Sequence, residues 1–156
     1  MVGFSISSYT DLANNSGPTL NSTTNGSQVT IDNTLPTLTT VSIASDNSVS
    51  NTAAKSGDEV TLTVVASENI TEPTISIISG GQGVTNAIVV SGTGNSYTAK
   101  FTVDSGDNDG NCTFTISGYT DNAGNSGLGV TAVTDGTSVK VDNTPPTVYT
   151  LSLIHI

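Results

Sequence analysis

Cys112-Thr-Phe-Thr-Ile-Ser-Gly-Tyr119 alternates apolar and polar side chains, and this stretch decides the class of fold. A period of two residues places Cys112, Phe114 and Ile116 on one face of an extended strand, with Thr and Ser on the other. Phe114 also begins a block of sequence that occurs twice in the chain. The stretch therefore predicts both a half-buried β-strand and a repeated unit.

The same alternation continues outward in short runs separated by Gly, Asn, Asp and Pro, without any sustained 3.6-residue period. Glu59–Ser67 points Val60, Leu62, Val64 and Ala66 one way, and Tyr97–Val103 points Tyr97, Ala99, Phe101 and Val103 one way. Further strands are predicted at Thr37–Ile43, after Pro73 with Ile75 and Ile77 inward, at Ala87–Val90 and at Ser138–Val141. Gly80–Gly83 and Gly92–Gly94 are predicted to be hairpin turns. The pattern predicts an all-β fold of about seven antiparallel strands.

An internal repeat covers both ends of the chain. Residues 4–37 align without a gap onto residues 114–147, and 18 of the 34 aligned positions are identical. A repeat at a fixed offset is typical of tandem arrays. Copies joined by a short linker need their ends at opposite poles, which favours a seven-stranded sandwich over a closed barrel.

Four motifs in order make a family resemblance specific: Ser67-Glu-Asn-Ile-Thr-Glu-Pro73, Asp107-Asn-Asp-Gly-Asn111, Tyr119-Thr-Asp-Asn-Ala-Gly-Asn125 and Val141-Asp-Asn-Thr-Pro-Pro-Thr147. With these motifs residues 1–149 resemble the bacterial Ig-like repeats of large surface adhesins and other secreted proteins. The resemblance implies an Ig-like antiparallel β-sandwich in a non-enzymatic stalk, located outside the cell or on its surface. It also implies that neighbouring repeats are the partners, and that other domains bind any host or surface ligand.

The repeat predicts the following division of the chain. Residues 1–33 are expected to be the last two strands of a truncated preceding repeat, an orphan β-hairpin, because Met1 aligns with Asn111 inside a strand. Residues 34–144 are expected to form one complete domain, and residues 145–150 to start another. Residues 151–156, Leu-Ser-Leu-Ile-His-Ile, resemble a translated sequencing adapter and are expected to be an artefact.

Charge and residue usage exclude several classes of function. Three Lys or Arg against 13 Asp or Glu give a formal charge of −10, which opposes binding to nucleic acid or anionic lipid. No apolar run approaches the roughly 18 residues that span a bilayer. His155 lies in the adapter-like segment and Cys112 in a strand, so no nucleophile and base can be paired, and we predict that the chain is not an enzyme. Cys112 is expected to be a small buried hydrophobe rather than a reactive thiol.

Acidic residues are predicted to gather at both poles of the sandwich. One pole would hold Asp32, Asn33, Glu68, Asp121 and Asn125, with Glu72 in the same loop as Glu68. The other would hold Asp104, Asp107, Asp109 and Asp142, with Asn143 beside Asp142. Carboxylate and amide oxygens are hard ligands, so Ca²⁺ is the expected ion. The alternative is that these side chains only close turns by bonding local backbone amides. An EF-hand is excluded, because Ile116 stands where a bidentate Glu is needed.

Two other functions remain open from the sequence. A carbohydrate- or protein-binding module would recognise its ligand through exposed loops, and an accessory domain of a secreted hydrolase would share this composition. Sugar binding usually needs exposed aromatic rings, whereas Tyr97 and Phe101 are predicted to point inward and Trp is absent. The sequence therefore favours the stalk.

Overall fold

The structure is a computed structural model that describes residues 2–148. The chain divides into an N-terminal unit, residues 1–34, and a C-terminal unit, residues 35–156. The strands of the described part all lie in the C-terminal unit. None of the described residues belongs to a helix of the length and apolarity that crossing a bilayer requires. The adapter-like segment, residues 151–156, lies outside the described residues.

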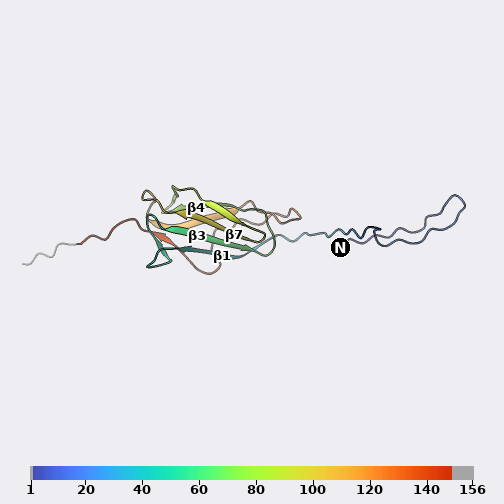
Figure 1. The fold of residues 1–156 in the computed structure, drawn as a ribbon, viewed down its shortest axis with the longest axis horizontal. Coiled ribbons are helices and arrows are strands. Elements are labelled where there is room, and N and C mark those ends of the chain that lie inside the picture. Colours follow the sequence, from blue (N-terminus) through green and yellow to red (C-terminus); the bar gives the residue numbers. More distant parts are fainter. Residues whose placement is uncertain (1, 149–156) are drawn as a thin grey trace, which may run out of the picture. The chain divides into compact units, whose positions relative to one another are not determined.

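Two sheets make up the C-terminal unit, and their strands run along its length (Figure 1). The first sheet has the order β1-β3-β7-β6, all antiparallel: β1 (Leu38–Ser45), β3 (Glu59–Ala66), β7 (Ser96–Thr102) and β6 (Val89–Thr93). The second has the order β2-β9-β8-β4-β5, antiparallel except for the β2–β9 pair: β2 (Ala53–Ala54), β9 (Lys140–Val141), β8 (Gly110–Ser117), β4 (Thr74–Ser79) and β5 (Gln82–Gly83). The predicted all-β class is confirmed.

The inward faces of both sheets contribute to one hydrophobic core. Along β3 every second residue is buried, and Val60, Leu62 and Val64 are fully enclosed. The buried cluster also includes the predicted inward residues of the other strands: Ile75, Ile77, Tyr97, Ala99, Phe101, Val103, Cys112, Phe114 and Ile116. A period of two in each strand thus produces two sheets that share a core, a sandwich-like arrangement.

The structure differs from the predicted strands in its short or exposed elements. β2 and β5, with two residues each, were not predicted, whereas β9, also of two residues, lies within the predicted strand Ser138–Val141. The predicted turn at Gly80 joins β4 to β5, whereas β6 extends through Gly92, which was predicted to lie in a turn. Gly92 has a φ of 141°, and a Cβ there would meet the Ser96 carbonyl oxygen at 2.3 Å. Glycine therefore allows the strand to continue where the sequence indicated its end.

The chain enters and leaves the C-terminal unit at opposite ends of β3 (Figure 1). At the incoming end the amide of Ser67, just after β3, donates to the carbonyl oxygen of Thr37 at 2.8 Å. At the outgoing end the amide of Ser56, just before β3, donates to Oδ1 of Asn143 at 2.7 Å. An eight-residue strand spans about 26 Å, so the two ends are separated by the length of the sheet.

The N-terminal unit pairs with itself through isolated bridges. Ile6 bridges Leu20 and Thr10 bridges Ser16, both antiparallel. Nearer its open end the amide of Val2 donates to the carbonyl oxygen of Val29 at 2.8 Å. The two arms of this unit therefore lie side by side in a hairpin-like loop without a continuous strand.

Candidate functional site

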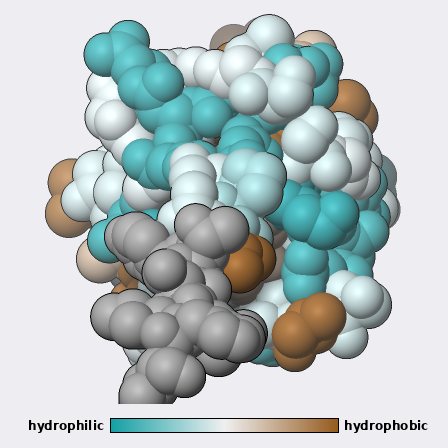
Figure 2. Space-filling view, turned by 90° about the vertical axis from the view of Figure 1, so that its left-hand side faces the viewer, coloured by the Kyte–Doolittle hydropathy of each residue, from teal (hydrophilic) through white to brown (hydrophobic). Residues whose placement is uncertain are grey.

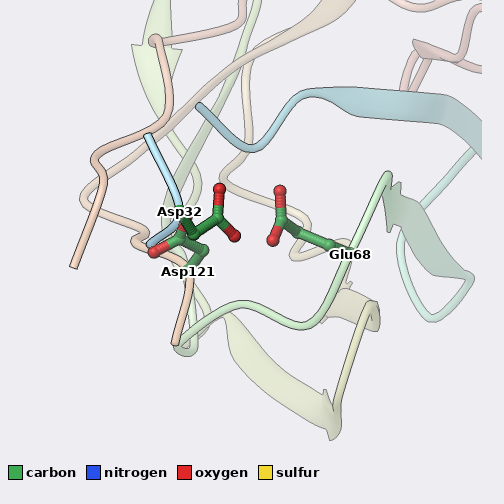
Figure 3. A group of neighbouring side chains, drawn as sticks. All are labelled: Asp32, Glu68 and Asp121. Carbon is green, nitrogen blue, oxygen red and sulfur yellow. The ribbon is translucent and has the colours of Figure 1, made fainter. Parts of the chain in front are cut away.

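The first candidate site is the acidic group at the incoming end of the C-terminal unit. Glu68 lies in the loop after β3 and Asp121 in the loop after β8, and Figure 3 shows both side chains. Their carboxylates offer oxygens within 4.8 Å of one another. The fold thus brings together two of the predicted calcium ligands from loops that are far apart in the sequence.

Asp121 closes a turn within its own loop. Its Oδ1 accepts the amides of Ala123 and Asn125, both at 2.8 Å, and its Oδ2 accepts Nδ2 of Asn125 at 2.8 Å. Burial raises the pKa of this carboxyl, but the Asn125 side chain and nearby backbone amides outweigh burial and hold the pKa below its ordinary value. A carboxylate has about four acceptor positions, so these bonds leave Asp121 little capacity for a cation.

The same turn forms in the N-terminal unit, where Asp11 and Asn15 occupy the repeat-equivalent positions. Oδ1 of Asp11 accepts the amides of Ala13 and Asn15, and its Oδ2 accepts Nδ2 of Asn15, all at 2.9 Å. All residues of this loop are exposed. Because the turn closes in two different surroundings, its geometry is encoded by the local motif Asp-x-Ala-x-Asn.

Asp32 and Asn33, the other predicted ligands at this pole, belong to the N-terminal unit. Asp32, the third side chain labelled in Figure 3, accepts the amide of Thr34 through Oδ1 at 2.9 Å. Asp142 accepts the amide of Thr144 at 3.2 Å in the equivalent turn. Within the C-terminal unit, therefore, Glu68 lies near Asp121, and Asp121 is bonded to Asn125. Asp32 and Asn33 are described with their own unit.

The second candidate site is the outgoing end, where Asn143 is bonded on several sides. Its amide donates to Oδ1 of Asp109 at 2.6 Å. Its side-chain Nδ2 donates to the carbonyl oxygens of Asp104 and Asp107, both at 3.1 Å, and its Oδ1 accepts the Ser56 amide. Asn143 therefore fastens the departing chain to two different loops. Sequence reasoning did not assign it this role, although the repeated Asp-Asn-Thr was a usable signal.

The carboxylates at this end are also engaged by donors of the protein. Asp109 accepts the Thr144 hydroxyl, and the bonds from Thr144 and from the Asn143 amide hold the pKa of Asp109 below its ordinary value. Asp107, which is buried, accepts the amides of Thr85 at 2.7 Å and Asp104 at 2.9 Å. Asp104 in turn accepts the Gly106 amide at 2.8 Å. These acidic side chains have a structural use that needs no ion.

Calcium binding stays a prediction at both poles. Calorimetric titration of Ca²⁺ into the full chain tests it at the incoming end, with Glu68→Gln as the variant expected to abolish the heat. Glu72→Gln, in the same loop, is the control and is expected to retain it. An absence of heat in the wild type at millimolar Ca²⁺, the range of extracellular calcium modules, would leave turn closure as the only role of these residues.

The surface of the C-terminal unit offers little for ligand stacking. Figure 2 shows hydrophilic (teal) and intermediate (white) colours, with separate brown patches, on the face that it presents. The aromatic side chains of this unit that the structure describes are all buried: Tyr97, Phe101, Phe114 and Tyr119. Tyr97 and Tyr119 use their hydroxyls internally, donating to the carbonyl oxygens of Ile70 at 2.9 Å and Leu128 at 2.8 Å.

Cys112 is buried in β8, as predicted, and burial raises the pKa of its thiol to about 11. The thiolate that would act as a nucleophile is therefore scarce at neutral pH. At the two candidate sites, the carboxylates and the Asn side chains bond the protein's own turns and loops. The Cys112 thiol is part of the core. No protein-family model matches this chain, and neither does any curated protein.

Proposed function

We propose that this chain is a non-enzymatic Ig-like repeat module that serves as a spacer in an extracellular or cell-surface protein. The observation that carries the proposal is the fastening of Asn143 at the point where the chain leaves the C-terminal unit. A spacer keeps its two ends far apart only if the chain leaves each unit in a fixed direction. Asn143 accepts a hydrogen bond from the Ser56 loop and donates to the loop of Asp104 and Asp107, and Thr144 donates to Asp109. These bonds support a defined direction for the departing segment.

Two features of the fold support this proposal. The incoming and outgoing ends lie at opposite ends of β3, so each unit adds its full length to an array. In the proposed Ig-like sandwich, β1-β3-β7-β6 would be the A-B-E-D strands, and β9-β8-β4, the middle of the second sheet, would be the G-F-C strands. Such sandwiches stack end to end in tandem arrays.

The buried aromatic side chains favour the spacer over a carbohydrate-binding module. Rings that bind sugars must be exposed, and the described rings of the C-terminal unit are at most 7% exposed. The accessory-domain alternative gains no support from any particular residue.

Backbone ¹⁵N relaxation on the full chain tests the fixed direction. Residues 142–144 are expected to show order parameters near those of the strands, about 0.85. Asn143→Ala removes the side-chain bonds to Ser56, Asp104 and Asp107, so the order parameters of this segment are expected to fall. Asn122→Ala, an exposed asparagine in the loop after β8, is the matched control and should change nothing at residues 142–144. A segment already mobile in the wild type would overturn the proposal.

A further inference from the structure

The chain contains one Asn-Gly pair, Asn25-Gly26, and every other asparagine precedes a residue that has a side chain. The backbone nitrogen that follows an asparagine can attack Cγ of the asparagine side chain, and a bulky side chain on the following residue hinders that approach. Glycine hinders it least, because glycine has no Cβ. Asn25 is therefore the asparagine of this chain at which such an attack meets the least steric resistance.

The pair lies in a loop that is open to water. Residues 24–27 are all exposed, and a Cβ built on Gly26 would meet no atom within 4 Å. The repeat-equivalent pair of the C-terminal unit, Asp135-Gly136, is also exposed, although its loop is bonded to β1. Exposure thus belongs to this loop in both units, and the loop leaves room for a ring to close.

A turn around Asn25 holds the reacting groups. Oδ1 of Asn25 accepts the Ser27 amide at 3.1 Å, the bond by which an asparagine side chain closes a turn on the backbone two residues on. Oδ1 is the atom that gains negative charge when a nitrogen adds to Cγ, so a donor aimed at it favours the addition. The Gly26 amide donates to the Thr23 carbonyl oxygen at 3.4 Å, beyond the usual upper limit of about 3.2 Å. The attacking nitrogen is therefore weakly held.

We propose that Asn25 is a deamidation site, at which the chain converts a side-chain amide to a carboxylate without an enzyme. The Gly26 nitrogen adds to Cγ of Asn25, and the new C–N bond closes a succinimide ring. The Cγ–Nδ2 bond breaks, and the proton of the Gly26 amide passes through solvent to the departing nitrogen, which leaves as ammonia. Water then opens the ring at either carbonyl carbon and gives aspartate or isoaspartate. This proposal is independent of the spacer role.

The C-terminal unit shows that the turn accommodates the aspartate product. Asp135 stands 110 positions after Asn25, and its Oδ1 accepts both the amide of Thr137 at 3.1 Å and the hydroxyl of Thr137 at 2.7 Å. These bonds hold the pKa of Asp135 below its ordinary value. Ser27, the equivalent of Thr137, also offers an amide and a hydroxyl. Aspartate at position 25 is therefore expected to keep the turn, while adding one negative charge to the loop.

Incubation of the full chain in mildly alkaline buffer, followed by peptide mapping with mass spectrometry, tests the site. Fragment masses follow each asparagine separately, because deamidation changes the mass of the residue. Asn25 is expected to convert at least about tenfold faster than every other asparagine, a barrier difference of about 1.4 kcal/mol. Ammonia should be released in the same molar amount as Asn25 is lost. An Asn25 that stays intact, or that converts no faster than the others, overturns the proposal.

Gly26→Ala places a methyl group beside the attacking nitrogen and is expected to slow the conversion of Asn25 at least about tenfold. Gly3→Ala, in the same unit, is the matched control, because a Cβ there also meets no atom within 4 Å. It should leave the rate unchanged. If Gly26→Ala converts as fast as the wild type, the Gly26 nitrogen is not the attacking atom and the proposal is wrong.

Ala123→Gly creates a second exposed Asn-Gly pair, at Asn122, and leaves the loop of Asn25 unchanged. The amide of residue 123 donates to Oδ1 of Asp121 at 2.8 Å, so the attacking nitrogen is firmly held there. Asn122 in this variant is expected to convert at least about tenfold more slowly than Asn25 in the same molecule. This comparison decides even if Gly26→Ala alters the turn, since equal rates would contradict the part assigned to the weakly held Gly26 nitrogen.

Discussion

Tyr119 and Gly127 form a close pair in which the absence of a side chain is essential. A Cβ built on Gly127 would lie 1.9 Å from Cε2 of Tyr119, whose ring is 1% exposed. The Gly127 amide donates to the Tyr119 carbonyl oxygen at 3.0 Å, and this bond keeps the backbone of Gly127 next to Tyr119. Gly17 stands in the same relation to Tyr9, with a distance of 2.0 Å. Packing of a ring on bare backbone thus explains why both copies contain Gly here.

Gly127→Ala is accordingly expected to destabilise the C-terminal unit by roughly 1–3 kcal/mol, the usual cost of overpacking. Gly129→Ala is the control, because a Cβ there would meet its nearest neighbour, the Ile116 carbonyl oxygen, at an ordinary 3.6 Å. Chemical denaturation of both variants measures the difference. Equal stabilities would mean that Tyr119 can move aside without loss.

The strands of the core were predictable from the sequence because burial on one face leaves a period of two. β3, β4, β7 and β8 lie where alternation predicts them, and their inward residues are those expected. β2 and β5 could not be predicted, because no run of alternating residues marks Ala53–Ala54 or Gln82–Gly83 and their pairing depends on tertiary hydrogen bonds. At the acidic poles two interpretations stayed open, ion binding and turn closure. The sequence could not reveal that Asp107 accepts amides from Thr85 and Asp104, or that Asp121 accepts the amide of Asn125. Residue type alone does not fix which donors a carboxylate will meet.

Substitution of Phe114 measures how much one strand, β8, contributes to the stability of the core. It lies in the middle of β8, is 7% exposed and pairs across the sheet with Ile77 of β4. Phe114→Ala should cost roughly 3–5 kcal/mol, because a large side chain is replaced by a cavity. Thr115→Ala, whose side chain points to the exposed face of the same strand, is the control and should change stability little. A loss below about 1 kcal/mol for Phe114→Ala would show that the core closes around the gap.

At the scale of the whole molecule, acidification acts on stability in two opposite ways. The chain carries a formal charge of −10 at pH 7 and has a pI near 4.1, so lowering the pH first reduces repulsion among its carboxylates. Asp58, Asp109, Asp121 and Asp135, however, have pKa values held below the ordinary 3.8, mainly by side-chain and backbone hydrogen bonds. A carboxyl whose pKa is lower in the folded than in the unfolded state stabilises the fold at pH values above its pKa in the unfolded state. That stabilisation is lost as the pH falls through the pKa of the group in the folded state.

The melting temperature of the full chain is therefore expected to rise as the pH is lowered from 7 towards the pI, and to fall below pH 3.8 as these carboxylates are protonated. Scanning calorimetry at several pH values and constant ionic strength measures the profile. Asp58→Asn tests the cause: Asp58 accepts Nδ2 of Asn47 at 2.7 Å and the Lys55 amide at 2.8 Å, and an amide oxygen can still accept but does not titrate. The fall below pH 3.8 should be shallower in this variant. A melting temperature that keeps rising at pH 2 would mean that relief of repulsion outweighs every lost carboxylate bond, which would contradict the prediction.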